Sequence, residues 1–223
     1  MAINKHSKGF TLIELMVVLG IIGLITLFAL PAFQGAGAGG RVRSAAFQMN
    51  TAVSLARQAA ITRSHQVALL MPDADLNLND ETRELAYSAY ALFGVTTVSA
   101  KRGYLSDWTR LPPGVVIDPN VEFYSGVDRR NVFSEGIVDG HVENVPFPYE
   151  VEGTSDQGLV TLTFRADGTL KGADSFAPRA VYLTTGSIPF SGRPEPEIDE
   201  ESTAFGIEVT GVTGHSSIRE YTP

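Results

Sequence analysis

An acidic residue stands at the start of the longest apolar stretch of the chain. Glu14 is followed by 19 residues without a charged side chain, from Leu15 to Phe33. A carboxylate inside a membrane-competent helix costs about 2.5 to 3.5 kcal/mol at the bilayer centre and less near an end, so it needs a partner. Cleavage between Gly9 and Phe10 would supply one, because the new α-ammonium lies one helical turn before Glu14. Helices side by side could then pair the amine of one with the acid of the next.

A second group of oxygen side chains has the spacing of a calcium-binding loop. Counted from Asp73, aspartates or asparagines occupy positions 1, 3, 5 and 7, and glutamates occupy positions 9 and 12. This is the spacing of the ligands in a 12-residue EF-hand loop. The pattern departs at Leu78, where the turn needs glycine, and at Asp80, where an apolar residue is usual. A solvated acidic turn between two strands would give the same alternation, so both interpretations stay open. The candidate calcium ligands are Asp73, Asp75, Asn77, Asn79, Glu81 and Glu84.

The remaining residue patterns give little support to enzymatic chemistry. The four histidines are scattered, and the sequence has no HExxH, GxSxG, P-loop or paired-cysteine motif. The absence of cysteine excludes a disulfide framework and thiol chemistry. We predict that the protein is not an enzyme and, apart from the calcium hypothesis, needs no cofactor.

The apolar stretch predicts a helix that anchors the chain in a membrane. At about 1.5 Å per residue, 19 residues are roughly enough to cross a bilayer core. Lys5 and Lys8 precede it, and basic residues stay on the cytoplasmic side, which puts everything after the helix outside. A secretory signal would place its cleavage site after the apolar core, and a plain anchor would need neither the Gly9-Phe10 junction nor the early acid. Both alternatives are therefore disfavoured.

The helix is expected to continue beyond a weak patch. Glycines at 35, 37, 39 and 40 each cost about 1 kcal/mol relative to alanine in a helix, which predicts a flexible joint. An amphipathic helix is then expected to about residue 65, so that joint and helix together occupy 34–65. Its apolar residues recur every three or four positions and suit packing against a sheet. These residues are Val42, Ala46, Met49, Val53, Ala56 and Ala60.

Residues 66–223 are predicted to form one β-sheet domain, which gives an α+β fold with a long N-terminal helix packed on an antiparallel sheet. Apolar or alternating runs predict the strands of this domain. A tight two-residue turn is expected at Asp167-Gly168. Two long polar connections are expected to be surface loops. The expected strands are 66–71, 84–95, 115–117, 159–164, 169–170, 180–184, 205–210 and 216–221, and the expected loops are 124–157 and 186–203.

The net charge of the chain indicates whether nucleic acid can be a partner. The chain has a formal net charge of −8 at pH 7, and its carboxyl-terminal stretch from Gly186 is predominantly acidic. An acidic surface repels phosphate backbones, so we predict that nucleic acid is not a partner.

The N-terminal residues also carry a family resemblance. Gly9-Phe10-Thr11-Leu12-Ile13-Glu14 and the apolar run after it resemble the prepilin signal of type IV pilins and type II secretion pseudopilins. The resemblance implies that residues 1–9 are a leader removed by a prepilin peptidase, that Phe10 is N-methylated, and that Glu14 neutralises the N-terminus of a neighbouring subunit. It also implies a membrane-spanning and assembly segment over 10–33, with a helix bend at Pro31.

Weaker similarities narrow the group. Ser54 to Arg63 with the strand after it, Trp108 to Gly114, and Phe164 to Gly168 are similar to features of GspH/FimT-type minor pseudopilins, although the acidic segment 194–201 departs from a compact member. The expected protein is a low-copy subunit near a filament tip. It starts in the bacterial inner membrane with a cytoplasmic N-terminus and a periplasmic C-terminal domain. Its expected partners are other pilin or pseudopilin subunits, the prepilin peptidase and methyltransferase, and the inner-membrane assembly platform.

Two alternatives use the same helix differently. One is a surface-binding pilin-like protein, an adhesin or a DNA-uptake subunit, whose long loops form the working surface. The other is a single-pass anchored β domain that binds calcium.

Overall fold

The computed structural model describes residues 12–74, 82–96, 102–120, 131–133, 141–148, 156–172, 178–199 and 201–222. Within these ranges the side chains at 23–36, 38, 141, 143–144 and 156–158 are left undescribed. The chain divides into two compact units, residues 1–38 and 39–223. The boundary falls inside the glycine-rich patch where the sequence predicts a joint.

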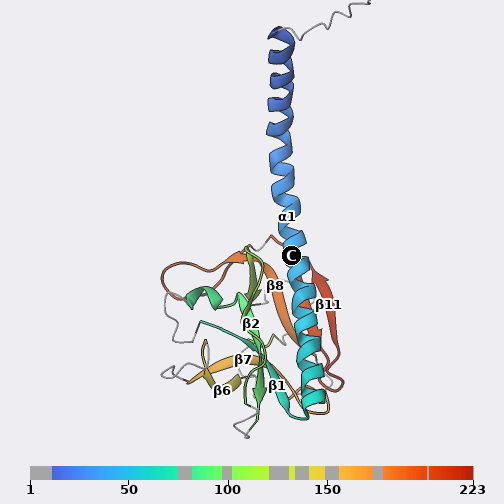
Figure 1. Cartoon of the computed structure of the whole chain (residues 1–223), viewed down its shortest axis with the longest axis vertical. Coiled ribbons are helices and arrows are strands. Elements are labelled where there is room, and N and C mark those ends of the chain that lie inside the picture. Colours follow the sequence, from blue (N-terminus) through green and yellow to red (C-terminus); the bar gives the residue numbers. More distant parts are fainter. Residues whose placement is uncertain are drawn as a thin grey trace, which may run out of the picture. The chain divides into compact units, whose positions relative to one another are not determined.

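Helix α1 (Leu12–Arg63) runs through both units without a break in its helical assignment (Figure 1). The glycine patch and Pro31 are therefore helical in the structure. The flexibility expected at the patch and the bend expected at Pro31 stay predictions.

The part of α1 in the second unit confirms the predicted apolar stripe. All six of its residues are fully buried, and the stripe also includes two further alanines, Ala45 and Ala52. Alanines fill most of its positions, so backbones of the helix and its neighbours can approach closely. Small side chains at these positions fit a helix that lies directly on sheets.

Two antiparallel sheets follow, where the sequence analysis expected one. In the first sheet β1 is an inner strand, and its Val67 pairs with Gly94 on one side and with Phe164 on the other. In strand order this sheet contains β3 (Gly103–Tyr104), β2 (Ala89–Val95), β1 (Gln66–Met71), β7 (Asp156–Phe164) and β6 (His141–Pro146), with β4 (Thr109–Arg110) also on β2.

The second sheet contains the last strands of the chain together with one strand from its middle. Its order is β11 (Ser216–Tyr221), β10 (Ala204–Val209), β8 (Arg179–Ser187) and β5 (Val115–Asp118), with β9 (Glu197–Ile198) also on β8. A short 3-10 helix, η1 (Arg83–Leu85), precedes β2.

The main core forms where the helix meets one face of each sheet. Its buried residues come mainly from α1, from β1, β2 and β7 of the first sheet, and from β5, β8 and β10 of the second. Figure 1 shows the lower half of α1 lying along these strands. The outer face of the first sheet carries a separate apolar cluster around Phe93, and that of the second carries a small one around Tyr182.

Most expected strands are confirmed, two of them, 66–71 and 216–221, with the same bounds. Five expectations about strands, loops and turns are wrong. The strand expected over 169–170 is only an isolated bridge between Leu170 and Phe164. The loop expected over 186–203 contains the end of β8 and the whole of β9. The strand expected over 84–95 starts only at Ala89, because η1 and a left-handed Tyr87 at φ 50° precede it. The loop expected over 124–157 contains β6.

The last wrong expectation is the tight two-residue turn at Asp167-Gly168. The Arg165 amide donates to the Thr169 carbonyl and the Gly168 amide donates back to the Arg165 carbonyl, with Gly168 at φ +83°. The connection is therefore a longer turn that ends in a left-handed glycine.

Candidate functional site

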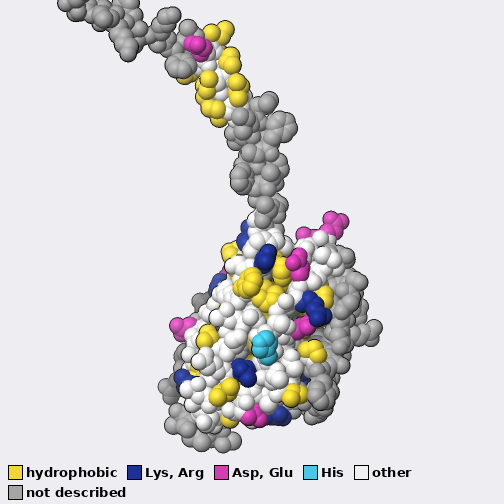
Figure 2. Space-filling model, turned by 90° about the vertical axis from the view of Figure 1, so that its right-hand side faces the viewer, with side chains coloured by type: hydrophobic (Ala, Val, Ile, Leu, Met, Phe, Trp, Pro, Cys, Tyr) yellow, Lys and Arg dark blue, Asp and Glu magenta, His cyan; other side chains and the backbone are white. Residues whose placement is uncertain are grey.

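The predicted assembly segment begins in the first turn of α1. Glu14 lies there, and a carboxylate at a helix N-terminus is stabilised by the helix dipole. Gly9 and Phe10 lie outside the described residues, so the pairing inferred from them stays a prediction. Large apolar side chains lie along this part of the helix and are 46% to 77% exposed, and Figure 2 shows yellow apolar side chains on its visible face with an acidic one near the start. They are Leu12, Ile13, Leu15, Met16, Val17, Val18, Leu19, Ile21 and Ile22.

A helix that is apolar all round needs an apolar environment, either other protein or lipid. Within the described residues, none of the helices contains a stretch long and apolar enough to qualify as a membrane span. The span predicted over 10–33 includes positions outside that description: residues 10 and 11, and the side chains from 23 onward.

The proposed calcium ligands are only partly described. Asp75, Asn77, Asn79 and Glu81 lie outside the described residues. Asp73 is buried two residues after β1, while Oε2 of Glu84 accepts a hydrogen bond from Nη1 of Arg110 at 2.7 Å. The described part of the chain holds no group of three or more acidic or histidine side chains arranged for a metal. Calcium binding stays a prediction.

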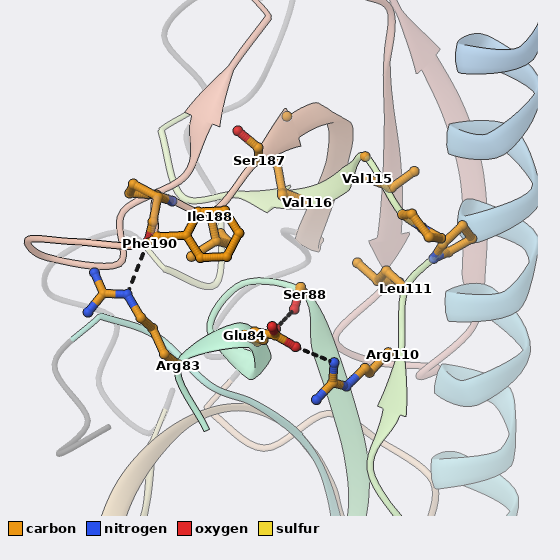
Figure 3. Close-up of a pocket in the computed structure, with 15 residues that line it drawn as sticks. Arg83, Glu84, Ser88, Arg110, Leu111, Val115, Val116, Ser187, Ile188 and Phe190 are labelled. Atoms are coloured by element: carbon orange, nitrogen blue, oxygen red, sulfur yellow. Dashed lines mark hydrogen bonds and ion pairs between the residues drawn. The ribbon is translucent and has the colours of Figure 1, made fainter. Parts of the chain in front are cut away.

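A cavity of about 420 Å³ lies between η1, the start of β5 and the connection after β8 (Figure 3). Its walls are mainly apolar, with Leu111, Val116 and Ile188 among the lining residues, and the Arg110–Glu84 ion pair lies at its edge. Pockets of this size and character bind apolar groups, while a few polar side chains orient what enters.

Arg83 shapes one wall of this cavity. Its Nε donates to the Pro189 carbonyl at 3.0 Å, and its Nη2 donates to the Gly192 carbonyl. These bonds hold the segment that carries Phe190, whose side chain is 94% exposed. Neither residue was predicted, because the polar composition of 186–203 indicates a surface loop. The signal available in the sequence was Phe190 itself, a lone aromatic residue between Pro189 and Gly192.

Gly186 fixes the start of the same segment. A Cβ added there would lie 2.6 Å from both the Glu197 carbonyl oxygen and Cγ2 of Val116. Only glycine therefore lets β9 and β5 approach β8 this closely at the cavity.

A second cavity, of about 360 Å³, lies between α1 and the strands β2 and β4. Burial raises the pKa of the Tyr90 hydroxyl at this cavity, and hydrogen bonds with Gln48 and Thr109 oppose that shift. Tyr90 therefore stays neutral at physiological pH and acts there as a hydrogen-bonding group.

Comparison with known proteins finds similarity at the N-terminus. Residues 4–30 match the family model described as the prokaryotic N-terminal methylation motif. The chain is 58% identical over 31 residues to the type IV major pilin protein PilE1 of Neisseria gonorrhoeae, and equally to a fimbrial protein of Neisseria meningitidis. The match covers 14% of this chain and 19% and 18% of those proteins, so it spans less than a fifth of their length.

Solved structures give distant likenesses over more of the chain. The minor pseudopilin EpsH from the type 2 secretion system of Vibrio cholerae is 11% identical, with a TM-score of 0.39, over 82% of this chain and 98% of that one. The type IV minor pilin FimU of Pseudomonas aeruginosa is 12% identical, with a TM-score of 0.38, over 82% and 90% respectively.

Proposed function

We propose that this type IV pilin-like chain is a minor structural subunit of a type II secretion pseudopilus or a type IV pilus. The observation that carries the proposal is the methylation motif over residues 4–30, which contains the Gly9-Phe10 junction, Glu14 and the start of the apolar helix. This combination gives one chain a processing site, a charge to be paired and an apolar surface to be covered.

The proposed route follows from these parts. A prepilin peptidase removes residues 1–9, and the new N-terminus on Phe10 is methylated. The apolar half of α1 holds the subunit in the inner membrane, with residues 39–223 on the periplasmic side. On assembly, Glu14 pairs with the N-terminal amine of a neighbouring subunit, and the apolar helices of the filament cover one another.

The assignment to a minor, low-copy subunit rests on the GspH/FimT-type features of the sequence. The helix end at Ser54 to Arg63 leads directly into β1, and β1 takes the centre of the first sheet. Gene neighbours encoding a secretin, an assembly ATPase and other prepilin-like proteins would identify the system.

Glu14→Gln tests the pairing. The variant keeps the shape of the side chain and loses its charge, so it should stay in the membrane while its entry into filaments falls at least about tenfold, the loss expected for about 1.4 kcal/mol of a charged contact. The measurement is the amount of subunit in sheared filaments relative to the membrane fraction. Glu220→Gln, an exposed carboxylate in β11, is the matched control and should be incorporated normally. Normal incorporation of Glu14→Gln would refute the pairing.

Gly9→Leu tests the processing step separately. A large residue before the junction should block cleavage and leave the leader attached, as read by mass spectrometry of the purified chain. An intact leader on the wild-type protein in a host with an active prepilin peptidase would overturn the proposed function.

A further inference from the structure

The connection after β8 that carries Phe190, residues 188–192, is called the Phe190 segment. It lies at the end of the second unit, the β domain of residues 39–223, where the chain enters that unit. Gly39 is the first residue of this unit, and Arg41 follows on the first turn. Nη2 of Arg41 lies 3.8 Å from the position that a Cβ on Gly114 would take, and the Gly114 carbonyl accepts a hydrogen bond from the Gly186 amide at 3.1 Å. These contacts connect the entry of α1 to the end of β8, and Figure 1 shows the connection after β8 at that end of the domain.

Phe190 projects from this end. The side chain is 94% exposed, and its backbone is held on both sides by the Arg83 hydrogen bonds to Pro189 and Gly192. A large exposed aromatic residue on an anchored segment has already lost much of the conformational freedom that binding would otherwise remove. Figure 3 shows Phe190 beside Ile188 at the cavity.

The surroundings combine apolar groups with arginines. Pro113 is exposed, Arg41 is exposed on the first turn of the helix, and Arg193 is 58% exposed in an ion pair with Glu195 at 3.1 Å. Aromatic residues next to basic ones are the usual composition of a surface at the headgroup level of a membrane.

The chain length places this end near the bilayer. Only the residues between 33 and 39 separate the apolar segment from the β domain. They span about 9 Å as a helix, and about 20 Å if fully extended. Whatever angle the joint adopts, the entry end stays within that reach of a membrane holding the apolar segment.

We propose that the Phe190 segment docks the β domain onto the bilayer surface, with the ring at the boundary between headgroups and acyl chains and with Arg41 near lipid phosphates. The proposal rests on the proposed function, because it needs the apolar half of α1 in the membrane. A subunit docked in this way is held against the lipid until assembly lifts it out.

Charge has a secondary part in this contact. The exposed carboxylates of Glu195, Glu197, Asp199 and Glu201 outnumber Arg41 and Arg193, so this surface is net acidic. The contact should therefore depend on the Phe190 ring and not on anionic lipid, and added salt should not weaken it.

The test uses the full chain reconstituted in phosphatidylethanolamine and phosphatidylglycerol vesicles. Because the protein has no cysteine, one introduced cysteine carries an environment-sensitive dye at a known place. The reporter is Ser191→Cys, exposed beside Phe190, and quenchers are attached either to lipid headgroups or to acyl chains. Val212→Cys is the matched control, an exposed apolar position in the turn that contacts Arg57 toward the other end of α1.

Lipid-borne quenchers should quench the Ser191→Cys label at least about threefold more than the Val212→Cys label, and adding Phe190→Ser should remove the difference. Equal quenching at both positions overturns the inference. So does a label that is shielded from aqueous iodide but insensitive to lipid quenchers, because protein would then cover the segment. A third label at Leu19→Cys separates the proposed function from the proposed docking. If lipid quenchers do not quench this label, the membrane position of α1 is wrong. If they quench it but not the Ser191→Cys label, only the docking is wrong.

Discussion

Asp167 shows how one exposed side chain fixes a turn. Its Oδ1 accepts hydrogen bonds from the Thr169 amide at 2.9 Å and from the Thr169 hydroxyl at 2.7 Å. The hydroxyl bond, then the amide bond, lowers the pKa of the carboxyl. A lowered pKa means that the folded state favours the ionised form, so the stabilisation is present above the unfolded pKa of about 3.9 and is lost as the pH falls through the folded value.

Asp167→Ala should therefore lower the melting temperature at pH 7, and its difference from the wild type should shrink as the pH falls below about 4. Circular dichroism melts from pH 3 to pH 7 measure this. Asp167→Asn is the control, because it keeps an acceptor but cannot titrate, so its difference from the wild type should follow the same course, level at higher pH and shrinking below about pH 4. A constant difference for Asp167→Ala would contradict the assignment.

The single residues that matter were predictable only where local chemistry required them. Glu14 stands out because a charge in an apolar run is costly whatever the fold. Phe190 was missed, since its segment is held by Arg83, more than one hundred residues earlier, through hydrogen bonds to the Pro189 and Gly192 carbonyls. The calcium pattern had the spacing without the glycine that such a loop needs, and its central residues are outside the described chain.

Helix α1 joins the two sheets through a polar contact as well as through the core. Nε of Arg57 donates to the Gly168 carbonyl at 3.2 Å and to the Thr213 carbonyl at 3.0 Å. Gly168 belongs to the turn after β7, and Thr213 to the turn between β10 and β11, so one side chain ties a turn from each sheet to the helix. A Cβ on Gly214 would lie 2.0 Å from the Gly168 carbonyl oxygen, which shows how closely the two turns approach.

Arg57→Met should remove both hydrogen bonds while keeping the apolar stem, and should cost about 1 to 2 kcal/mol of unfolding free energy. Urea unfolding followed by circular dichroism measures the loss. Gln58→Met, at the next and exposed position of the same helix, should change stability by less than about 0.5 kcal/mol. Equal effects of the two changes would show that Arg57 does not join the sheets.

The predictability of the elements depended on how regular their patterns are. The stripe of α1 and the run at 66–71 repeat with the periods of a helix and a buried strand, and both were found. Strand β6 was missed because a register irregularity lies between Val142 and Val145, which leaves two buried valines three residues apart. The pairing of strands into two sheets joins segments far apart in the sequence, so no local pattern contained it.

At the scale of the molecule, the β domain contains its own core. Among the described side chains, the buried residues of the main cluster begin at Val42, after the boundary between the two units. The stability of residues 39–223 should therefore be independent of the segment before them.

A chain of residues 39–223 should unfold in urea with a free energy within about 0.5 kcal/mol of the full chain in detergent. Fluorescence of Trp108, the sole tryptophan, reports the transition, because its ring lies 5.3 Å from the Phe147 ring in the outer cluster of the first sheet. A large loss in the shorter chain would mean that residues 1–38 contribute to the fold.

The inner position of β1 also sets an order of events during folding. One neighbour of β1, strand β2, is close in sequence, but the other, β7, begins only at Asp156. The second side of β1 can therefore pair, as Val67 does with Phe164, only once that distant segment is present. Closing so long a loop has a large entropic cost, and domains dominated by such distant pairings fold slowly. The first sheet is therefore completed only after most of the polypeptide has been synthesised, and until then the edge of β1 stays open to wrong partners.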